Sequence, residues 1–412
     1  MARIRDIALK DEGHQRIAWV AKHMPVLNQI GDKYEKTKPF KGLKISLSIH
    51  LEAKTAYLAK TLARCGAEMH VTGSNPLSTQ DAVCSALVDD GIEVYAIHGS
   101  DPEDTIALWK ETLACKPHIV IDDGSDLFNL LLTDCKDHAT NLIGGCEETT
   151  SGVQRLRGWE AQGLLHFPVM AINDARCKSF FDNTYGTGQS TWDGIMRTTN
   201  LQVNGRVVVV AGYGYCGRGI AKVAKGLGAR VIVTEIDPVK SILAVMDGFE
   251  AKNMAEAAPL GDIFITATAC CDVIRPEHFN VMKDGAIVCN AGHFNIEIDL
   301  DGLNKMAVSK KEARKNIETY LLENGRRINI IANGALVNIA AADGHPVEIM
   351  DISFSLQALG ALYILDHQGQ LGAGVHVIPD EVDRVVAEMK LKDFGGSFDT
   401  LLPEQIAYMK SH

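Results

Sequence analysis

The segment Val207–Gly217 constrains the fold of this chain more than any other, because it joins a β-branched strand to a glycine-rich turn and then to a helical stretch. Its glycines, Gly212, Gly214 and Gly217, have the spacing G-x-G-x-x-G. In such a turn the first glycine allows a tight bend, the second lets the backbone approach a pyrophosphate, and the third lets the helix pack on its strand. The segment predicts a dinucleotide-binding Rossmann domain. The alternative is that the glycines serve only strand-to-helix packing.

A carboxylate after the next strand distinguishes between the two nicotinamide dinucleotides. The run Val231–Thr234 is followed by Glu235, about 20 residues beyond the glycine turn. A carboxylate at this point accepts a hydrogen bond from a ribose 2′-hydroxyl and repels a 2′-phosphate. The predicted cofactor is therefore NAD rather than NADP, unless Glu235 is only a solvated strand end.

Length, charge and cysteine content narrow the class of protein. A chain of 412 residues exceeds what one hydrophobic core usually supports, so two domains are expected. The net charge of −11 argues against a nucleic-acid partner and an anionic membrane surface. The ten cysteines lack C-x-x-C pairs and zinc-ligand spacing, which is typical of reduced thiols in a cytoplasmic protein and predicts no metal site. Residues 352–365, the longest apolar stretch, are too short and interrupted to cross a membrane, and we expect no membrane association.

The first part of the chain alternates strand-like and helix-like segments. Helices are expected over residues 15–34, 53–65 and 79–89, and strands over 43–49, 68–72, 92–97 and 119–121. This βα order predicts a parallel sheet, and ligands of such sheets bind beyond the carboxyl ends of the strands. Polar residues follow three of the predicted strands, namely His50, Ser74–Asn75 and Asp122–Asp126. These residues should meet in one crevice.

Further strands over 263–266 and 286–289 complete an α/β fold of two doubly wound parallel-sheet domains. The predicted substrate domain comprises residues 1–173 and 345–390, because the segments after His345 lack a nucleotide signature and can return to the first domain. The predicted NAD-binding Rossmann domain comprises residues 174–344, and residues 391–412 form a short C-terminal tail. Hinges are expected near Asn173 and Gly344.

The run Glu147–Gly152 places two carboxylates and three hydroxyls beside a helix start. One interpretation is a capping box with Ser151 as the N-cap and Gln154 three residues later. Two adjacent carboxylates exceed what capping requires, however, and they would also suit the diol of a sugar.

Lys178 and Asp182 are four residues apart and share a face if the segment is helical. They form either an exposed ion pair or, given the flanking Phe180–Phe181, a partly buried lysine that exchanges a proton with a sugar hydroxyl. His293 follows the predicted strand 286–289, where a nicotinamide would lie in the usual pose. Asn338 and His345 carry weaker signals, since the Gly-His-Pro turn at 344–346 also suits a simple domain hinge.

Taken together, these motifs closely resemble the S-adenosylhomocysteine hydrolase family over almost the whole chain. The matching segments are Asn75–Asp81, Asp122–Asp126, Glu147–Thr150, Lys178–Asn183, Gly212–Gly214, Thr234–Pro238, Asn290–Phe294 and Gly344–Pro346. The resemblance implies an NAD-dependent enzyme of the methylation cycle and one-carbon metabolism. Such an enzyme reversibly hydrolyses S-adenosyl-L-homocysteine to adenosine and L-homocysteine by 3′-oxidation, C4′ deprotonation, elimination, water addition and re-reduction. It also implies an oligomer, most simply a homotetramer.

The resemblance carries roles to individual residues. Lys178, assisted by Asp182 and Asn183, would handle the 3′-hydroxyl proton, and Glu148 with Thr149 would hold the ribose hydroxyls. Protons at C4′ and C5′ would be managed by His50 and Asp123, the leaving sulfur would face His293, and the purine edge would face His345. The implied substrate-binding set is Glu52, Lys54, Thr55, Asn75, Gln80, Thr149, His345 and Met350. The implied NAD-binding set is Thr149, Thr150, Ser151, Asn183, Gly212, Gly214, Tyr215, Cys216, Gly217, Glu235, Asn290, Ala291, Gly292 and Asn338.

Three departures from the family pattern qualify these expectations. Larger members have a threonine and a glutamate two and four positions beyond the first histidine, where this chain has Glu52 and Lys54. Because the donor Lys54 suits a purine with an oxygen at C6, S-inosyl-L-homocysteine is an alternative substrate. Thr187 stands where many relatives have a cysteine. The chain also stops at Tyr408–His412, so the lysine and tyrosine that many relatives deliver to a neighbouring subunit's NAD are not expected here, and NAD would be held less tightly.

Two other functions remain open at the level of sequence. An NAD-dependent 2-hydroxy acid dehydrogenase would share the glycine turn. A non-enzymatic NAD-binding relative is disfavoured, because His50, Asp123, Lys178, Asp182 and His293 are all present.

Overall fold

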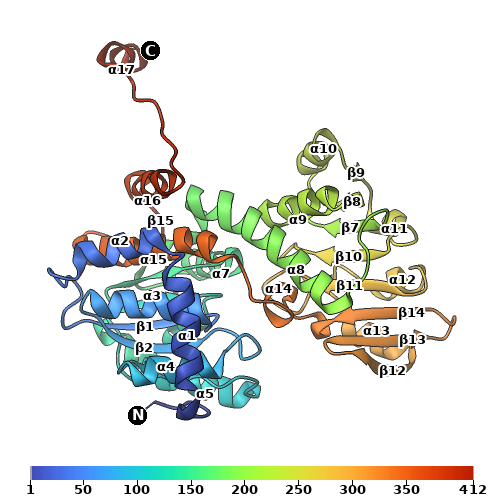
Figure 1. Ribbon diagram of the computed structural model, residues 1–412, viewed down its shortest axis with the longest axis horizontal. Coiled ribbons are helices and arrows are strands. Elements are labelled where there is room, and N and C mark those ends of the chain that lie inside the picture. Colours follow the sequence, from blue (N-terminus) through green and yellow to red (C-terminus); the bar gives the residue numbers. More distant parts are fainter. Residues whose placement is uncertain (1, 412) are drawn as a thin grey trace.

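The computed structural model describes residues 2–411; Met1 and His412, which belong to the predicted first domain and tail, lie outside the described residues. The chain builds two separate sheets, one of seven strands and one of eight. Figure 1 shows the two sheets side by side, each with its own helices, joined by the chain near α8 and again before α15. The predicted α/β fold class is confirmed.

The seven-stranded sheet has the order β15-β6-β5-β4-β1-β2-β3, and every pair in it is parallel. Its strands are β1 (Lys44–Ile49), β2 (Glu68–Gly73), β3 (Glu93–Val94), β4 (Ile119–Asp122), β5 (Gly144–Glu147), β6 (Pro168–Ala171) and β15 (Gly374–Val377). Successive residues of β4 enter different cores, because side chains alternate across a strand. Ile119 and Ile121 pack with α1 to α4 and α15, whereas Val120 packs with Phe128 and Leu156 on the other face. Both faces are therefore covered, as parallel sheets require.

Helices on both faces of this sheet, together with short connecting turns, complete the first half. They are η1 (Ile7–Leu9), α1 (Lys10–Ala21), α2 (Pro25–Tyr34), α3 (Ala53–Arg64), α4 (Asp81–Asp89), α5 (Pro102–Leu113), α6 (Asp126–Leu132), η2 (Lys136–Asn141), α7 (Thr150–Ala161), α15 (Val347–Asp366) and α16 (Asp380–Asp393).

The eight-stranded sheet has the order β12-β13-β14-β11-β10-β7-β8-β9. Its strands are β7 (Val207–Ala211), β8 (Arg230–Thr234), β9 (Glu250–Ala251), β10 (Ile263–Thr266), β11 (Ala286–Asn290), β12 (Ala307–Arg314), β13 (Ile317–Leu322) and β14 (Arg327–Ile331). The neighbouring pairs from β14 through β11, β10, β7 and β8 to β9 are all parallel. At the other edge, β13 pairs antiparallel with both β12 and β14. Val208 and Val210 enter one core and Val209 the other, so the valine run is buried on both sides. The antiparallel extension was not predicted.

The second half contains η3 (Ile172–Asp174), η4 (Lys178–Gly186), α8 (Thr187–Thr199), α9 (Tyr215–Gly226), α10 (Pro238–Met246), α11 (Met254–Ala257), α12 (Pro276–Phe279), α13 (Leu300–Met306), η5 (Ala332–Gly334) and α14 (Val337–Ala340), counted from the first connection onward. Beyond α16, the helix α17 (Pro403–Lys410) is exposed along its length, and Figure 1 shows it projecting away from both sheets.

Two predicted elements differ from the structure. The helix expected over residues 15–34 is divided into α1 and α2, because Pro25 begins a new helix and cannot continue the preceding one. The strand expected over residues 92–97 is reduced to Glu93–Val94 at the edge of the sheet, where Tyr95 forms only an isolated bridge to Arg3.

The helix α15 is long and apolar enough to cross a membrane by length and composition alone. However, 72% of its most apolar window is buried inside the protein. It packs on α2, α3 and α16 and is the central helix of the first half. Its apolar character is therefore explained by the core that it fills.

Candidate active site

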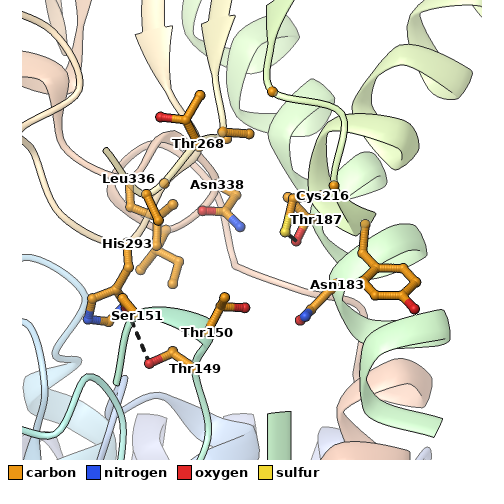
Figure 2. A pocket seen from close by; sticks show the side chains of 18 of the residues that line it. Thr149, Thr150, Ser151, Asn183, Thr187, Cys216, Thr268, His293, Leu336 and Asn338 are labelled. Carbon is orange, nitrogen blue, oxygen red and sulfur yellow. Dashed lines mark hydrogen bonds between the residues drawn. The ribbon is translucent and has the colours of Figure 1, made fainter. Parts of the chain in front are cut away.

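A cavity of about 810 Å³ lies between the two sheets. In the first half its walls include His50 after β1, Asp123 after β4 and Glu148 after β5. In the second half they include Gly212 after β7 and His293 beyond β11. The carboxyl ends of both parallel sheets thus face one cavity, which is where ligands of such folds bind. Figure 2 shows side chains from both halves, among them Thr149, Asn183, His293 and Asn338, arranged around this open space.

The structure brings most of the predicted site residues together. Those that line the cavity are His50, Glu52, Lys54, Thr55, Gln80, Asp123, Glu148, Thr149, Thr150, Ser151, Lys178, Asp182, Asn183, Gly212, Gly214, Tyr215, Cys216, Glu235, Ala291, Gly292, His293, Asn338, His345 and Met350.

Three predicted site residues stand behind the wall of the cavity instead. Asn75 folds its own loop, because its side chain accepts from the backbone of Leu77 at 2.9 Å. A Cβ on Gly217 would lie 1.9 Å from the Gly212 carbonyl oxygen, so that glycine serves close packing. The buried Asn290 amide donates to the carbonyls of Gly292 and Phe294 and so shapes the turn before and after His293.

The segment Lys178–Gly186 is a π-helix rather than the expected α-helical face. Its turn is wider than that of an α-helix, so residues four and five positions ahead both flank the first one. The Lys178 Nζ accordingly lies 3.3 Å from Asp182 Oδ2 and donates to Asn183 Oδ1 at 2.7 Å. This geometry explains why a lysine, an aspartate and an asparagine from one short segment meet at the same point.

Burial and charge act against each other at Lys178. Its Nζ lies 3.4 Å from Glu148 Oε1, and the lysine is only 5% exposed. Burial by itself favours the neutral amine, but the charges of Asp182 and Glu148 outweigh it and raise the pKa of Lys178. Burial raises the pKa of Glu148 to about 8, despite the opposing charge of Lys178. Near neutral pH the cluster therefore contains an ammonium beside a carboxyl group that readily gains or loses a proton.

Two side chains of the apolar helix α15 complete this cluster. Ser353 Oγ donates to Asp182 Oδ2 at 2.6 Å, and Gln357 Nε2 donates to Glu148 Oε2. Neither residue was predicted from the sequence. The available signal was their spacing of four residues, which places both on one face of a largely apolar helix that also contains Asp351 and Ser355.

His345 belongs to this cluster as well as to the connection between α14 and α15. Its Nδ1 is hydrogen-bonded to Asp182 Oδ1, and its Nε2 lies 3.3 Å from Thr187 Oγ1. Burial raises the pKa of Asp182, but the charges of Lys178 and His345 dominate and lower it. The connection between the two halves is thus hydrogen-bonded, through His345, to the carboxylate beside Lys178.

A second polar group lies across the cavity. His50 Nε2 is 3.5 Å from Asp123 Oδ2, and His293 Nδ1 is 3.8 Å from Asp123 Oδ1. Ser74 Oγ donates to Asp123 at 2.9 Å and fixes its orientation. Burial lowers the pKa of His50 to about 4, despite the opposing charge of Asp123, so its imidazole is neutral at neutral pH. The ligand atoms of the two histidines and the aspartate lie within 4.8 Å of one another, a spacing that also suits a metal ion.

The adjacent carboxylates Glu147 and Glu148 have different environments. Glu148 lines the cavity, whereas Glu147 is fully buried behind it. Glu147 accepts bonds from the Gly124 amide at 2.9 Å and from the Thr149 amide and hydroxyl at 2.9 and 2.8 Å. Only Glu148 is therefore available to a sugar diol. The helix N-cap is Thr149, which accepts from the Gly152 amide, and the expected capping role of Ser151 is wrong.

The glycine turn fits a dinucleotide. Gly212 has φ +96°, and a Cβ there would lie 2.5 Å from the Ala267 carbonyl oxygen. A Cβ on Gly214 would meet no protein atom within 4 Å, so the backbone at the start of α9 borders open space in the cavity. The N-terminus of α9 has no side-chain cap, which leaves amide groups for an anion such as pyrophosphate. Glu235 also lines the cavity, and the Tyr213 amide donates to it at 2.7 Å.

Lys54 is less free than the sequence suggested. Its Nζ lies 2.9 Å from Glu52 Oε2 and donates to the Asp343 carbonyl oxygen at 3.0 Å. An ammonium carries three protons, so only one remains for a ligand.

Comparisons with known proteins agree with this geometry. The model of the S-adenosyl-L-homocysteine hydrolase family matches residues 1–143, and the model of its NAD-binding domain matches residues 183–344. An adenosylhomocysteinase of Thermococcus kodakarensis is 52% identical over 99% of this chain and 97% of its own length. An S-inosyl-L-homocysteine hydrolase of Methanocaldococcus jannaschii is 51% identical over 100% of this chain and 99% of its own length. An adenosylhomocysteinase of Thermotoga maritima is 51% identical over 97% of this chain and 99% of its own length.

Proposed function

Since this chain belongs to the S-adenosyl-L-homocysteine hydrolase family and its cofactor is NAD, we propose that it reversibly hydrolyses S-adenosyl-L-homocysteine to adenosine and L-homocysteine. The observation that carries this proposal is the Lys178 cluster. A buried lysine between Glu148 and Asp182, in the cavity that the glycine turn borders, is suited to a sugar hydroxyl that exchanges its proton.

Gly212, Gly214, Tyr215 and Glu235 would hold NAD along the glycine turn, with Thr149, Thr150 and Asn338 nearer the substrate. When bound, NAD would supply a reversible hydride acceptor for the ribose 3′-carbon, and oxidation there would make the neighbouring C4′ proton acidic.

The chain's own residues would bind the ribose and transfer the protons. Glu148 and Thr149 would hold the ribose hydroxyls, and the Lys178 ammonium would pass one proton to the Glu148 carboxylate, 3.4 Å away, as it accepts the proton of the 3′-hydroxyl. Asp182 and Asn183 fix the Lys178 ammonium, as their distances of 3.3 and 2.7 Å support. His50 and Asp123 transfer the protons at C4′ and C5′, and His293 faces the homocysteine sulfur. Closure of the two halves would exclude water during the elimination.

S-inosyl-L-homocysteine is the second candidate substrate, and Lys54 favours it. Lys54 lines the cavity and has one proton left for an acceptor on the base. A 6-oxo purine presents such an acceptor, whereas the amino group of adenine is a donor that suits the neighbouring Glu52 carboxylate instead.

The decisive experiment measures release of the homocysteine thiol from each of the two nucleosyl-homocysteines and compares their kcat/KM values. We expect thiol release without any net change in NADH. Enzyme stripped of NAD should lose this activity and regain it when NAD is restored. Absence of thiol release, or stoichiometric reduction of free NAD by a 2-hydroxy acid, contradicts the proposal.

The organisation of the protein follows from the same proposal. We assign substrate binding to residues 1–173 and 345–390 and NAD binding to 174–344, in agreement with the pairing of β15 with β6 in the first sheet. Residues 391–412 are assigned as a tail. A homotetramer in the cytoplasm that serves the methylation cycle is the corresponding proposal for assembly and location. Size-exclusion chromatography with light scattering tests the subunit number.

A further inference from the structure

The buried ammonium of Lys54 borders the substrate cavity and contacts the second connection between the two halves, which lies between α14 and α15. Lys54 lies in the first turn of α3 and is only 5% exposed. Its Nζ is bound by Glu52 Oε2 at 2.9 Å and by the Asp343 carbonyl oxygen at 3.0 Å. A buried ammonium needs a partner for each of its three protons, because an unpaired one costs a desolvation penalty. The structure satisfies two of them.

The backbone that Lys54 holds is part of the return to the first sheet. Asp343 lies between α14 and α15, and the Gly344 amide that follows donates to the Asn338 carbonyl at 2.9 Å. Gly344 has φ +74°, a conformation that glycine adopts without strain. On the outer side, the Asp343 carboxylate meets Arg197 at 3.1 Å, but both side chains are more than half exposed. That outer ion pair is therefore weak, and Lys54 is the buried tether of this segment.

The same segment continues into the catalytic cluster. One residue after Gly344, His345 is hydrogen-bonded to Asp182 and contacts Thr187. A displacement of the Asp343–Gly344 backbone that neighbouring dihedral angles do not compensate would therefore move the His345 imidazole. A contact at Lys54 is in this way connected to the carboxylate beside Lys178 through one short piece of backbone.

We propose that Lys54 is a positioning residue that couples recognition of the purine edge to the hinge at 343–345. This inference rests on the proposed function, because it takes the base to lie against Glu52 and Lys54. An acceptor on the base satisfies the third proton of Lys54 and fixes the ammonium against the Asp343 carbonyl. Binding energy from the base then stabilises the hinge in the geometry that orients His345 and Asp182.

The test uses the full-length, NAD-loaded enzyme with Lys54→Met, which keeps the length of the side chain and removes its charge and donors. We expect kcat to fall roughly tenfold or more on S-adenosyl- and on S-inosyl-L-homocysteine, because the lost bonds are charge-assisted. We also expect the ratio of the two kcat/KM values to approach one. The decrease in the radius of gyration on saturation with adenosine or inosine, measured by small-angle X-ray scattering, should become smaller.

Arg197→Met is the matched control, because it releases the same hinge residue from the outer side without touching the cavity. Its kcat should stay within about twofold of wild type on both substrates. Lys54→Gln, which retains a neutral donor, should fall between wild type and Lys54→Met and guards against simple misfolding.

An altered substrate ratio with normal kcat and normal closure in Lys54→Met overturns the inference, since Lys54 would then read the base without acting on the hinge. An equal loss of kcat in Arg197→Met also overturns it. If wild-type enzyme releases no homocysteine from either substrate, the proposed function fails, and that result is visible without any variant.

Discussion

The two halves of the molecule use similar parallel sheets to build different kinds of binding surface. In the second half, the surface is mainly backbone, formed by the turn Gly212–Gly217 and the uncapped start of α9. In the first half and the connections, the surface is made of side chains that arrive from distant segments, with Glu148 after β5, Lys178 on η4 and Gln357 on α15. A site made of backbone is encoded within about a dozen residues, whereas a site made of side chains forms only when the fold brings distant segments together.

The charged groups of the two halves also differ in how far they are buried and in what holds them. Glu148, Lys178 and Asp182 are almost fully buried and act on one another, so their protonation belongs to the group. Glu235 in the second half is only partly buried and is held by backbone amides. We therefore expect changes in the first group to affect chemistry and stability, and changes at Glu235 to affect cofactor choice.

The largest effect is expected for Lys178→Ala, which should lower kcat roughly a thousandfold, within the range for loss of a proton-transfer group. NAD should remain bound, because the glycine turn is untouched. Thiol release gives the rate, and cofactor extraction with absorbance gives the NAD content. Turnover near the wild-type level would rule out the role of Lys178. Loss of both NAD and activity would show that NAD binding depends on Lys178 as well as on the glycine turn.

A smaller effect, on stability, is expected at Glu147. Burial raises the pKa of Glu147 to about 7 from 4.5. Between these values the folded protein keeps a proton that the unfolded chain has lost, so the free energy of unfolding should decrease as pH rises. The decrease is about 1.4 kcal/mol per pH unit, up to about 3 kcal/mol in all.

Glu147→Gln should remove this contribution, so its melting temperature relative to wild type should rise between pH 5 and pH 8, as measured by differential scanning calorimetry. The glutamine oxygen keeps the acceptor for the Gly124 and Thr149 amides. An unchanged difference in melting temperature across this range would show that Glu147 does not titrate there.

The smallest effect is expected at Glu235. Glu235→Ala should weaken NAD binding roughly tenfold and relax discrimination against NADP, because the ribose acceptor and the negative charge are both removed. Glu235→Gln is the control that keeps an acceptor oxygen while removing the charge, so mainly NADP binding should improve. Equilibrium dialysis with each dinucleotide gives both affinities. An unchanged preference in both variants would refute the ribose assignment.

Long, regularly patterned elements could be predicted from the sequence, and irregular ones could not. The run Val207–Ala211 was recognised because buried parallel strands are often continuous β-branched stretches. The run Lys44–Ile49 was recognised because its apolar residues alternate with serines, which is the period of a strand. The strand Gly144–Glu147 was not predicted, since its two glycines disfavour a strand. Gly145 is required there because a Cβ would lie 2.5 Å from the Phe128 ring, a contact that no local pattern shows.

In the candidate site, too, local motifs were predictable from the sequence, whereas contacts between distant segments were not. The motifs indicated which residues meet at the cavity, but their roles remain predictions. Ser353 and Gln357 were not found, because their spacing of four residues does not show what they contact until the helix is placed against Asp182 and Glu148. Lys54 was identified as a donor to the base, but its bond to the Asp343 carbonyl spans 289 residues of chain.

The sequence by itself determined the family, the NAD cofactor and the two-sheet fold, because short-range glycine spacing and strand patterning act through the local backbone. Only the tertiary structure decided which of two adjacent glutamates faces the cavity, that a π-helix places Asp182 and Asn183 beside Lys178, and that the buried Lys54 ammonium donates to the Asp343 carbonyl. The physical reason is that burial and charge pairing depend on groups far apart in the chain, and their energies exist only when those groups are brought into contact.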